Sequence, residues 1–158
     1  MRKDYISWHA YFMGVAKLSA MRSKDPDTQV GACIVNDDKR IIGIGYNGFP
    51  QGISDQSFPW QRKGNFLDTK YPYVVHAEAN AILNATTSIK GATLYVTLFP
   101  CNECAKLIIQ SGIKKIIFED DKHKDSDVHK ASIKMLDAAG VTYEKLSTGN
   151  LKYEEILK

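Results

Sequence analysis

Four side chains in two short segments have the types and the spacing of a metal-dependent catalytic site. His76 and Glu78 stand two residues apart, and Cys101 and Cys104 follow in the segment Pro-Cys-Asn-Glu-Cys. Zinc binds one imidazole and two thiolates in a tetrahedron, and catalytic zinc sites keep the fourth position for water. A carboxylate that stays off the metal can act as general acid and base. The residue types therefore indicate a catalytic zinc site with its own acid–base group.

The elements around these segments decide whether the four groups can meet. Cys101 and Cys104 are three residues apart, so at the start of a helix they lie on one face. A helix N-terminus also lowers the pKa of a thiol, which favours the thiolate that binds metal. His76 and Glu78 would stand about 200° apart within a regular helix. They can serve one site only if His76 precedes the helix predicted over residues 77–87, where the backbone is not yet helical.

Two alternatives explain part of this pattern. A structural zinc site normally has four protein ligands, whereas no fourth Cys or His stands at ligand spacing nearby. A Cys-x-x-Cys segment alone is also typical of a redox pair. Neither alternative accounts for the complete set of imidazole, carboxylate and two thiols, so we favour a catalytic zinc ion.

Length and composition predict a single domain over residues 1–158, with 44% hydrophobic and 25% charged residues. The net charge of +3 does not by itself argue for a nucleic-acid partner and is compatible with an anionic small substrate. Of the three cysteines, only Cys33 lies outside the metal motif. This usage fits a reducing compartment, so we expect a cytoplasmic protein. We find no signal peptide and no apolar run of membrane-spanning length, so no membrane is expected.

Hydrophobic periodicity and turn residues predict helices that alternate with strands. The expected helices cover 5–21, 77–87, 101–110, 126–139 and 153–157, and the expected strands cover 30–35, 41–46, 93–97, 113–118 and 141–146. This order favours an α/β fold, a three-layer α/β/α sandwich around a five-stranded mixed sheet that begins with a hairpin. Gly43 and Gly45 alternate in the second strand, which predicts a close approach by another backbone or a ligand.

Polar residues outside the metal motif are weaker candidates. Arg22 and Lys24 are most simply solvated charges at a helix end, and the alternative is a phosphate clamp, because Arg has a forked set of donors. Asn47 offers a donor and an acceptor that suit a sugar hydroxyl, although a plain turn residue is the simpler interpretation. The long loop over 53–73 is expected to be functional or a partner contact. It contains no Cys or His, so we expect no second metal there.

The sequence resembles the cytidine deaminase superfamily, and within it the deoxycytidylate deaminases, over nearly its whole length. His-x-Glu followed by Pro-Cys-x-x-Cys is the signature of zinc deaminases. The more specific stretches are RSKDPDTQVGACIVN at 22–36, GIGYNGFPQGISD at 43–55, LDTKYPYVVHAEANAI at 67–82 and FPCNECAKLIIQSGIKKIIF at 99–118. The resemblance implies hydrolytic deamination of dCMP to dUMP and ammonia, which supplies dUMP for thymidylate synthesis.

The resemblance also implies a role for each site residue. His76, Cys101 and Cys104 would bind zinc, and Glu78 would be the catalytic proton shuttle. The substrate-binding residues that it implies are Arg22 near the phosphate, Asn47 at the deoxyribose, Ala77 and Lys124. For Arg22 and Asn47 this reverses the simpler interpretations given above.

Regulation is implied by the resemblance as well. It suggests a homohexamer that dCTP activates and dTTP inhibits, with Mg²⁺ a candidate companion of the triphosphate. The effector candidates lie in the loop after the second strand, and they are Gly48, Phe49, Gln51 and Gly52. The sequence departs from the family at His123, where relatives tend to have Tyr, and at Lys124, where they have His or Arg. Lys124 offers a charge but no bidentate fork.

In the implied mechanism, zinc lowers the pKa of its bound water. Glu78 accepts that proton, delivers it to N3 of the cytosine ring, and later carries a proton to the leaving amine. A bifunctional dCMP/dCTP deaminase is compatible with the same residues. A nucleic-acid-editing deaminase would need a basic surface or aromatic platform, and the mild charge argues against it. A zinc module without activity would have no use for Glu78.

Overall fold

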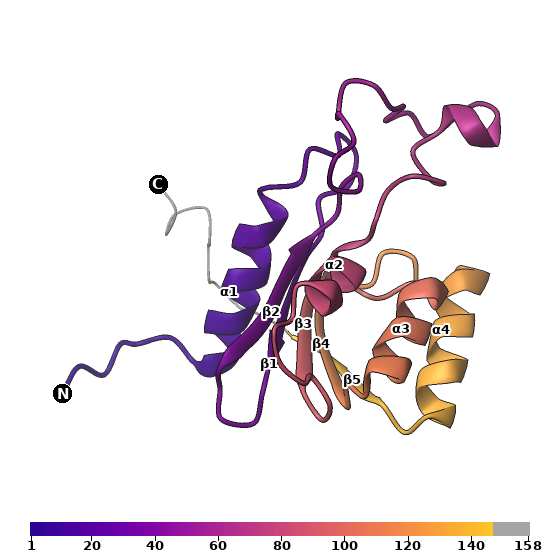
Figure 1. Ribbon diagram of the computed structural model, residues 1–158. Helices are drawn as coiled ribbons and strands as arrows, with labels where there is room; N and C mark the ends of the chain where they lie inside the picture. The colour runs from indigo at the N-terminus through magenta and orange to yellow at the C-terminus, as the bar shows by residue number, and fades with distance from the viewer. Residues whose placement is uncertain (147–158) are drawn as a thin grey trace.

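The computed structural model describes residues 1–146, which form one five-stranded sheet with helices on both faces (Figure 1). The elements in chain order are α1 Trp8–Ala20, β1 Gly31–Val35, β2 Ile41–Tyr46, the 3-10 turn η1 Phe66–Asp68, α2 Ala77–Leu83, β3 Thr93–Leu98, α3 Asn102–Ser111, β4 Lys115–Asp120, α4 Asp127–Ala138 and β5 Thr142–Lys145. The predicted order of four helices and five strands is confirmed within these residues. The helix predicted over 153–157 lies outside them.

The sheet has the strand order β2-β1-β3-β4-β5. β1 pairs antiparallel with both β2 and β3, whereas β3, β4 and β5 run parallel. Because β1 and β2 are joined by a short polar turn, they form the predicted hairpin at one edge. Parallel strands need crossover connections, and α3 and α4 provide them. The predicted mixed sheet and three-layer α/β/α sandwich are confirmed.

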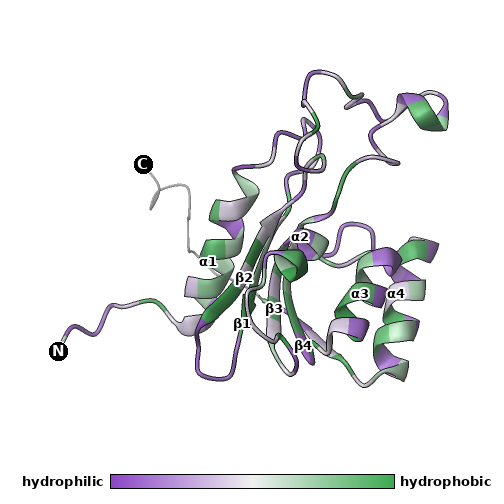
Figure 2. Cartoon of the chain, in the orientation of Figure 1, coloured by the Kyte–Doolittle hydropathy of each residue, from purple (hydrophilic) through white to green (hydrophobic). Residues whose placement is uncertain are grey.

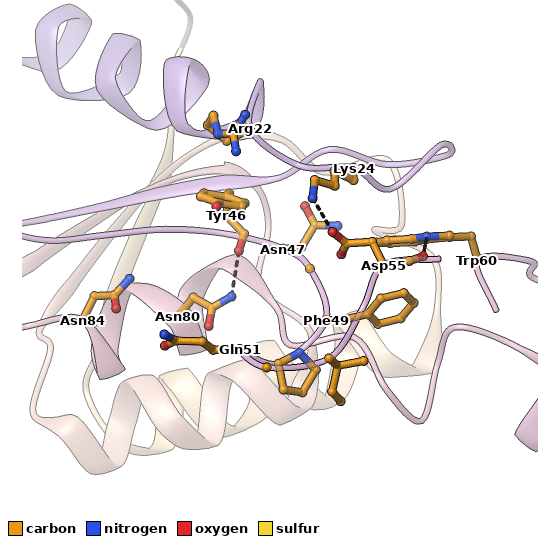
Figure 3. Close-up of a pocket in the computed structure, with 14 residues that line it drawn as sticks. Arg22, Lys24, Tyr46, Asn47, Phe49, Gln51, Asp55, Trp60, Asn80 and Asn84 are labelled. Carbon is orange, nitrogen blue, oxygen red and sulfur yellow. Dashed lines mark hydrogen bonds and ion pairs between the residues drawn. The ribbon is translucent and has the colours of Figure 1, made fainter. Parts of the chain in front are cut away.

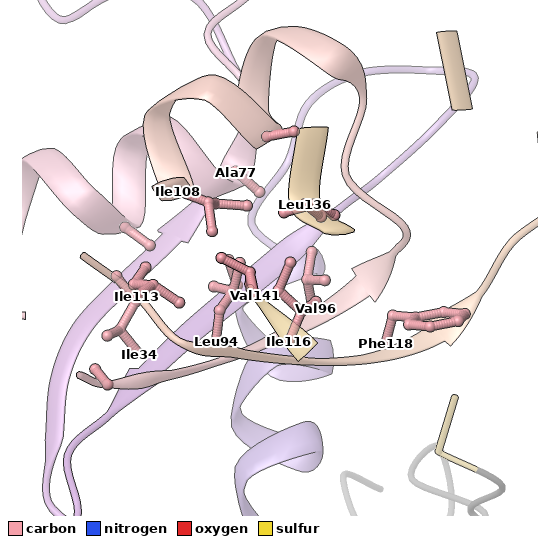
Figure 4. Close-up of a cluster of buried hydrophobic side chains, with 14 of the residues drawn as sticks. Ile34, Ala77, Leu94, Val96, Ile108, Ile113, Ile116, Phe118, Leu136 and Val141 are labelled. Carbon is pink, nitrogen blue, oxygen red and sulfur yellow. The ribbon is translucent and has the colours of Figure 1, made fainter. Parts of the chain in front are cut away.

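Alternating side chains on the central strands supply two cores. On one face, Cys33 of β1, Tyr95 of β3 and Ile117 of β4 pack against α1. On the other face, a larger cluster joins the strands to α2, α3 and α4 (Figure 4). Its labelled members include Ile34, Leu94, Val96, Ile108, Ile113, Ile116 and Leu136. Because successive strand residues point to opposite faces, each central strand contributes to both cores.

Helix α2 lies directly against β2, and this contact explains the alternating glycines. A Cβ atom on Gly43 would lie 2.5 Å from the carbonyl oxygen of Ala81 in α2. The predicted close approach is therefore confirmed, and the approaching group is the backbone of α2. The helix ends at Leu83, earlier than the predicted residue 87. The N–H of Ala85 already bonds to the carbonyl of Ile82, in the tighter pattern of a finishing turn.

The hydropathy of the surface follows this arrangement (Figure 2). The turn between β1 and β2 is hydrophilic, whereas the strands themselves are hydrophobic. The segment between β2 and α2 extends from the sheet and carries η1 at its far end, where Phe66 and Leu67 are exposed. Among residues 1–146, no helix has the length and apolar character needed to cross a bilayer.

Candidate active site

Two helix starts bring the predicted metal ligands together. His76 precedes α2 with an extended backbone, φ −74° and ψ 157°, and Cys101 precedes α3 in the same way, with φ −70° and ψ 172°. Cys104 lies one turn into α3, and its backbone N–H donates to the sulfur of Cys101. The condition set by the sequence is therefore met, because His76 stands outside the helix that carries Glu78.

The three ligand atoms converge on one point. Nδ1 of His76 lies 3.4 Å from Sγ of Cys101 and 3.4 Å from Sγ of Cys104. All three ligand atoms lie within 4.8 Å of one another. Tetrahedral zinc, with bonds of about 2.05 Å to nitrogen and about 2.3 Å to sulfur, would separate such atoms by about 3.5 Å. The donor types and their spacing therefore fit a zinc ion.

Hydrogen bonds within this cluster shift the pKa values of all three side chains. A hydrogen bond with Cys104 lowers the pKa of Cys101 to about 4. The hydrogen bond to Cys101 raises the pKa of His76 to about 9. The pKa of Cys104 is raised, first by the same hydrogen bond and then by burial. The lowered pKa of Cys101 favours its thiolate, which is the form that binds metal.

Glu78 is buried beside this cluster, with 4% of its surface exposed. Burial raises the pKa of its carboxyl, while the positive charge of His76 opposes that rise. A carboxyl whose charged form is penalised by burial is a stronger proton acceptor than a solvated one, which suits a group that takes up a proton and returns it. Its position one residue inside α2 directs it to the same cluster without adding it to the ligand set.

A cavity of about 370 Å³ opens onto the cluster. Its wall contains His76, Ala77, Glu78 and Cys101, together with Asn47 from the end of β2. The structure therefore brings these predicted residues together at one end of the sheet. The wall also contains residues that the sequence analysis did not single out: Asp25, Arg62, Lys70, Tyr71, Ser126 and His129.

Asn47 is fixed by two hydrogen bonds at the edge of this cavity. Its Nδ2 donates to the carbonyl of Thr28 at 2.9 Å, and its Oδ1 accepts from the N–H of Val30 at 2.8 Å. A side-chain amide has a second N–H and a second lone pair, so each end retains one further hydrogen bond for a ligand. The side chain is buried, with 6% exposed.

A second cavity, of about 380 Å³, lies beside the first, because Asn47 lines both. Figure 3 shows the side chains that line the second cavity. It is lined by the effector candidates Gly48, Phe49, Gln51 and Gly52, and by Arg22, Lys24, Tyr46, Asp55, Trp60, Asn80 and Asn84 among others. Lys24 forms an ion pair with Asp55. Arg22 therefore lines this second cavity and not the wall around His76, so its predicted contact with the substrate phosphate stays a prediction.

The loop between β4 and α4 approaches the first cavity with His123 rather than with Lys124. His123 belongs to the cavity wall, whereas Lys124 is exposed and not part of it. The predicted role of Lys124 stays a prediction. His129 of α4 is buried in the same wall and packs against Phe99, with ring centroids 4.3 Å apart and ring planes tilted by 37°. Its helical spacing from Ser126 was the only sequence signal that could have indicated it.

Comparison with known proteins agrees with this geometry. A family model described as the cytidine and deoxycytidylate deaminase zinc-binding region matches residues 6–120. The fold and the metal cluster thus define a zinc-binding deaminase. The deoxycytidylate deaminases of Pongo abelii and Homo sapiens are 62% and 61% identical over 146 residues, which are 91% of this chain and 82% of each relative.

A solved structure shows the same likeness. The dCMP deaminase of cyanophage S-TIM5, in complex with dCMP and dUMP, is 30% identical, has a TM-score of 0.70, and is matched over 86% of this chain and 94% of that one. The chain belongs to the deoxycytidylate deaminases of the cytidine deaminase superfamily, a family of enzymes. The resemblance inferred from the sequence is thereby confirmed.

Proposed function

We propose that this enzyme hydrolyses dCMP to dUMP and ammonia and so supplies dUMP for thymidylate synthesis. The observation that carries the proposal is the convergence of His76, Cys101 and Cys104 beside the buried carboxyl of Glu78, at the base of a cavity. The high identity to proteins named deoxycytidylate deaminase supports dCMP as the substrate.

We assign His76, Cys101 and Cys104 as the ligands of one zinc ion. When bound, zinc supplies the Lewis acid that makes a water molecule acidic near neutral pH. The three protein donors leave one position for that water, as catalytic zinc sites require. The lowered pKa of Cys101 favours the thiolate and so favours binding of the cation, whereas His76 and Cys104 would give up their protons to it.

Glu78 moves the protons in this proposal. Its carboxylate accepts the proton from the attacking water and delivers it to N3 of the cytosine ring. It then takes the second water proton from the hydroxyl now on C4 and gives it to the amino group, so that the C4–N bond breaks, ammonia leaves and the C4 carbonyl of uracil forms. Its burial keeps the transferred proton from exchanging with bulk water during the reaction.

Asn47 and Ala77 are our proposed contacts to the nucleoside part of the substrate. Both line the wall of the first cavity. The second N–H and lone pair of the Asn47 amide suit a deoxyribose hydroxyl. The backbone of Ala77, between His76 and Glu78, suits the polar edge of the base.

The second cavity is our proposed effector site, with dCTP as activator and dTTP as inhibitor. Phe49 and Trp60 pack in its wall with centroids 4.1 Å apart and ring planes tilted by 35°, and Lys24 and Arg22 supply positive charge. An aromatic wall beside two cations suits a nucleotide, and Mg²⁺ would accompany the triphosphate. We further propose a homohexamer in the cytoplasm, where cysteine ligands stay reduced.

A direct assay tests the proposal. Loss of cytosine absorbance is followed with dCMP, deoxycytidine and dCTP, each with and without added effector, on protein of measured zinc content. We expect turnover of dCMP alone, increased by dCTP. Turnover of dCTP would support the bifunctional alternative. Zinc-loaded protein that converts none of the three would contradict the proposal, and binding of a labelled single strand would then favour the nucleic-acid-editing alternative.

A further inference from the structure

One buried ion pair stands in the wall of the first cavity. Nζ of Lys70 lies 2.6 and 2.7 Å from the two carboxylate oxygens of Asp25 and 3.1 Å from Oδ2 of Asp27. Lys70 and Asp25 are 6% and 4% exposed. Burial of two charges carries a desolvation cost that excellent geometry has to offset. Stability alone therefore does not explain why a buried ion pair occupies this position.

The ammonium group of Lys70 is not available to a ligand. It has three N–H donors, and the structure provides three carboxylate oxygens within hydrogen-bonding distance. Lys70 thus lies in the cavity wall without a donor left for a substrate phosphate. Its role there is to hold protein groups, not to bind substrate.

Asp25 passes this constraint on to Asn47. Oδ1 of Asp25 accepts from the backbone N–H of Thr28 at 3.1 Å, and the carbonyl of Thr28 accepts from Nδ2 of Asn47 at 2.9 Å. A short chain of hydrogen bonds therefore runs from Lys70 through Asp25 and Thr28 to the amide of Asn47. Side chains linked in this way lose their rotational freedom together.

Lys70 also anchors the other side of the cavity. Its backbone N–H donates to the carbonyl of Gln61, and its carbonyl accepts from the N–H groups of Tyr73 and Val74. The segment that follows leads directly to His76. The ion pair thus joins the loop after α1 to the segment that precedes α2, and both of its residues line the same cavity.

We propose that Asp25 and Lys70 form a positioning pair, which orients Asn47 for substrate binding through Thr28. This inference rests on the proposed function, because it assumes that Asn47 contacts the nucleotide. It predicts that loss of the pair weakens binding of dCMP and leaves the zinc cluster intact.

A double-mutant cycle tests the proposal, with Lys70→Met, Asn47→Ala and the double variant. Lys70→Met should raise KM for dCMP roughly tenfold, about the effect of losing one or two hydrogen bonds, with a much smaller change in kcat and unchanged zinc content. If Lys70 acts through Asn47, the double variant should have the KM of Asn47→Ala alone. Effects on KM that multiply would overturn the proposal.

Lys17→Met is the matched control, since it breaks the Lys17–Glu119 ion pair, of 2.7 Å, outside the wall of the first cavity. It should leave KM unchanged. If Lys70→Met does not fold, Asp25→Asn keeps an oxygen for the Thr28 N–H and should show the same non-additivity with a smaller rise in KM. A folded Lys70→Met or Asp25→Asn variant with the wild-type KM would refute this inference and leave the proposed function standing. Wild-type protein that does not convert dCMP would refute the proposed function itself.

Discussion

A methyl group on Gly45 would lie 2.3 Å from the carbonyl oxygen of Ala77. β2 and α2, the helix that follows His76, are therefore in backbone contact, with no room for any side chain between them. Asn80 strengthens the same contact by donating to the carbonyl of Tyr46 at 2.8 Å. Because Ala77 lies between His76 and Glu78, the position of β2 helps to fix the position of the proposed zinc ligand and the proposed proton shuttle.

Gly45→Ala should therefore damage both stability and activity. The added methyl has to displace α2, and overpacking of this kind typically costs about 1–3 kcal/mol. Chemical denaturation measures the loss of stability, and zinc content with dCMP turnover measures displacement of the site. Gly48→Ala is the comparison for stability, because a Cβ there meets nothing within 4 Å. Equal stability of the two variants would contradict the predicted contact.

Glu78→Ala should retain zinc and lose turnover. General acid–base transfer typically contributes 10²–10⁴-fold, so kcat should fall by roughly that factor or more. Glu78→Gln, which keeps the shape without the titrating proton, should behave in the same way. Metal analysis of both variants shows whether the ligands are undisturbed. Near-normal turnover of a zinc-loaded variant would exclude Glu78 as the proton shuttle.

Removal of the metal should abolish activity reversibly. Dialysis against a chelator should reduce turnover in step with zinc content, and added zinc should restore it. Cys104→Ser should lower zinc occupancy, because a hydroxyl is a poorer zinc ligand than a thiolate. Cys33→Ser leaves the ligand set intact and is the control for zinc occupancy. Full activity in zinc-free protein would contradict the proposed metal site.

The sequence predicted the elements because they depend on local spacing, and it predicted the metal cluster because two short motifs, 25 residues apart, together match the signature of zinc deaminases. The position of His76 before a helix, and the glycines of β2, could be interpreted from residues close in the chain. The pairing of Asp25 with Lys70 could not, because 45 residues separate them and only the path of the long loop brings them together. Arg22 illustrates the same limit. The sequence places it in the loop after α1, but the residues that line its cavity with it come from distant segments, such as Trp60 and Asn84.

Lys24→Met should weaken the response to the effector more than basal turnover. Lys24 lines the second cavity, where it pairs with Asp55, and it does not line the first. Loss of one phosphate-binding cation should raise the dCTP concentration needed for half-maximal activation about tenfold. Titration of dCTP at a fixed dCMP concentration measures this. Lys39→Met, in the turn between β1 and β2, is the control, and an unchanged dCTP response in Lys24→Met would contradict the assignment of this cavity.

Cys33 should make the stability of the protein sensitive to alkaline pH. It lies in β1 and is fully buried against α1, and this burial raises the pKa of its thiol from 9.0 to about 12. Below pH 9 the thiol is neutral in both states, so its ionisation costs nothing. As the pH rises from 9 towards 12, the unfolded chain loses the proton first and stability falls.

The expected size follows from the linkage. A pH of 10.5 is about 1.5 units above the pKa of the thiol in the unfolded chain. The free energy of unfolding of wild type should therefore fall by about 2 kcal/mol more than that of Cys33→Ala. Burial, the largest cause, raises the pKa of Tyr95 to about 12 in both proteins, so that part of its effect cancels, whereas the smaller part that comes from Cys33 is present in wild type alone. Urea denaturation of both proteins at pH 8 and pH 10.5 measures the difference. Parallel losses in the two proteins would show that Cys33 ionises as readily in the folded state as in the unfolded chain.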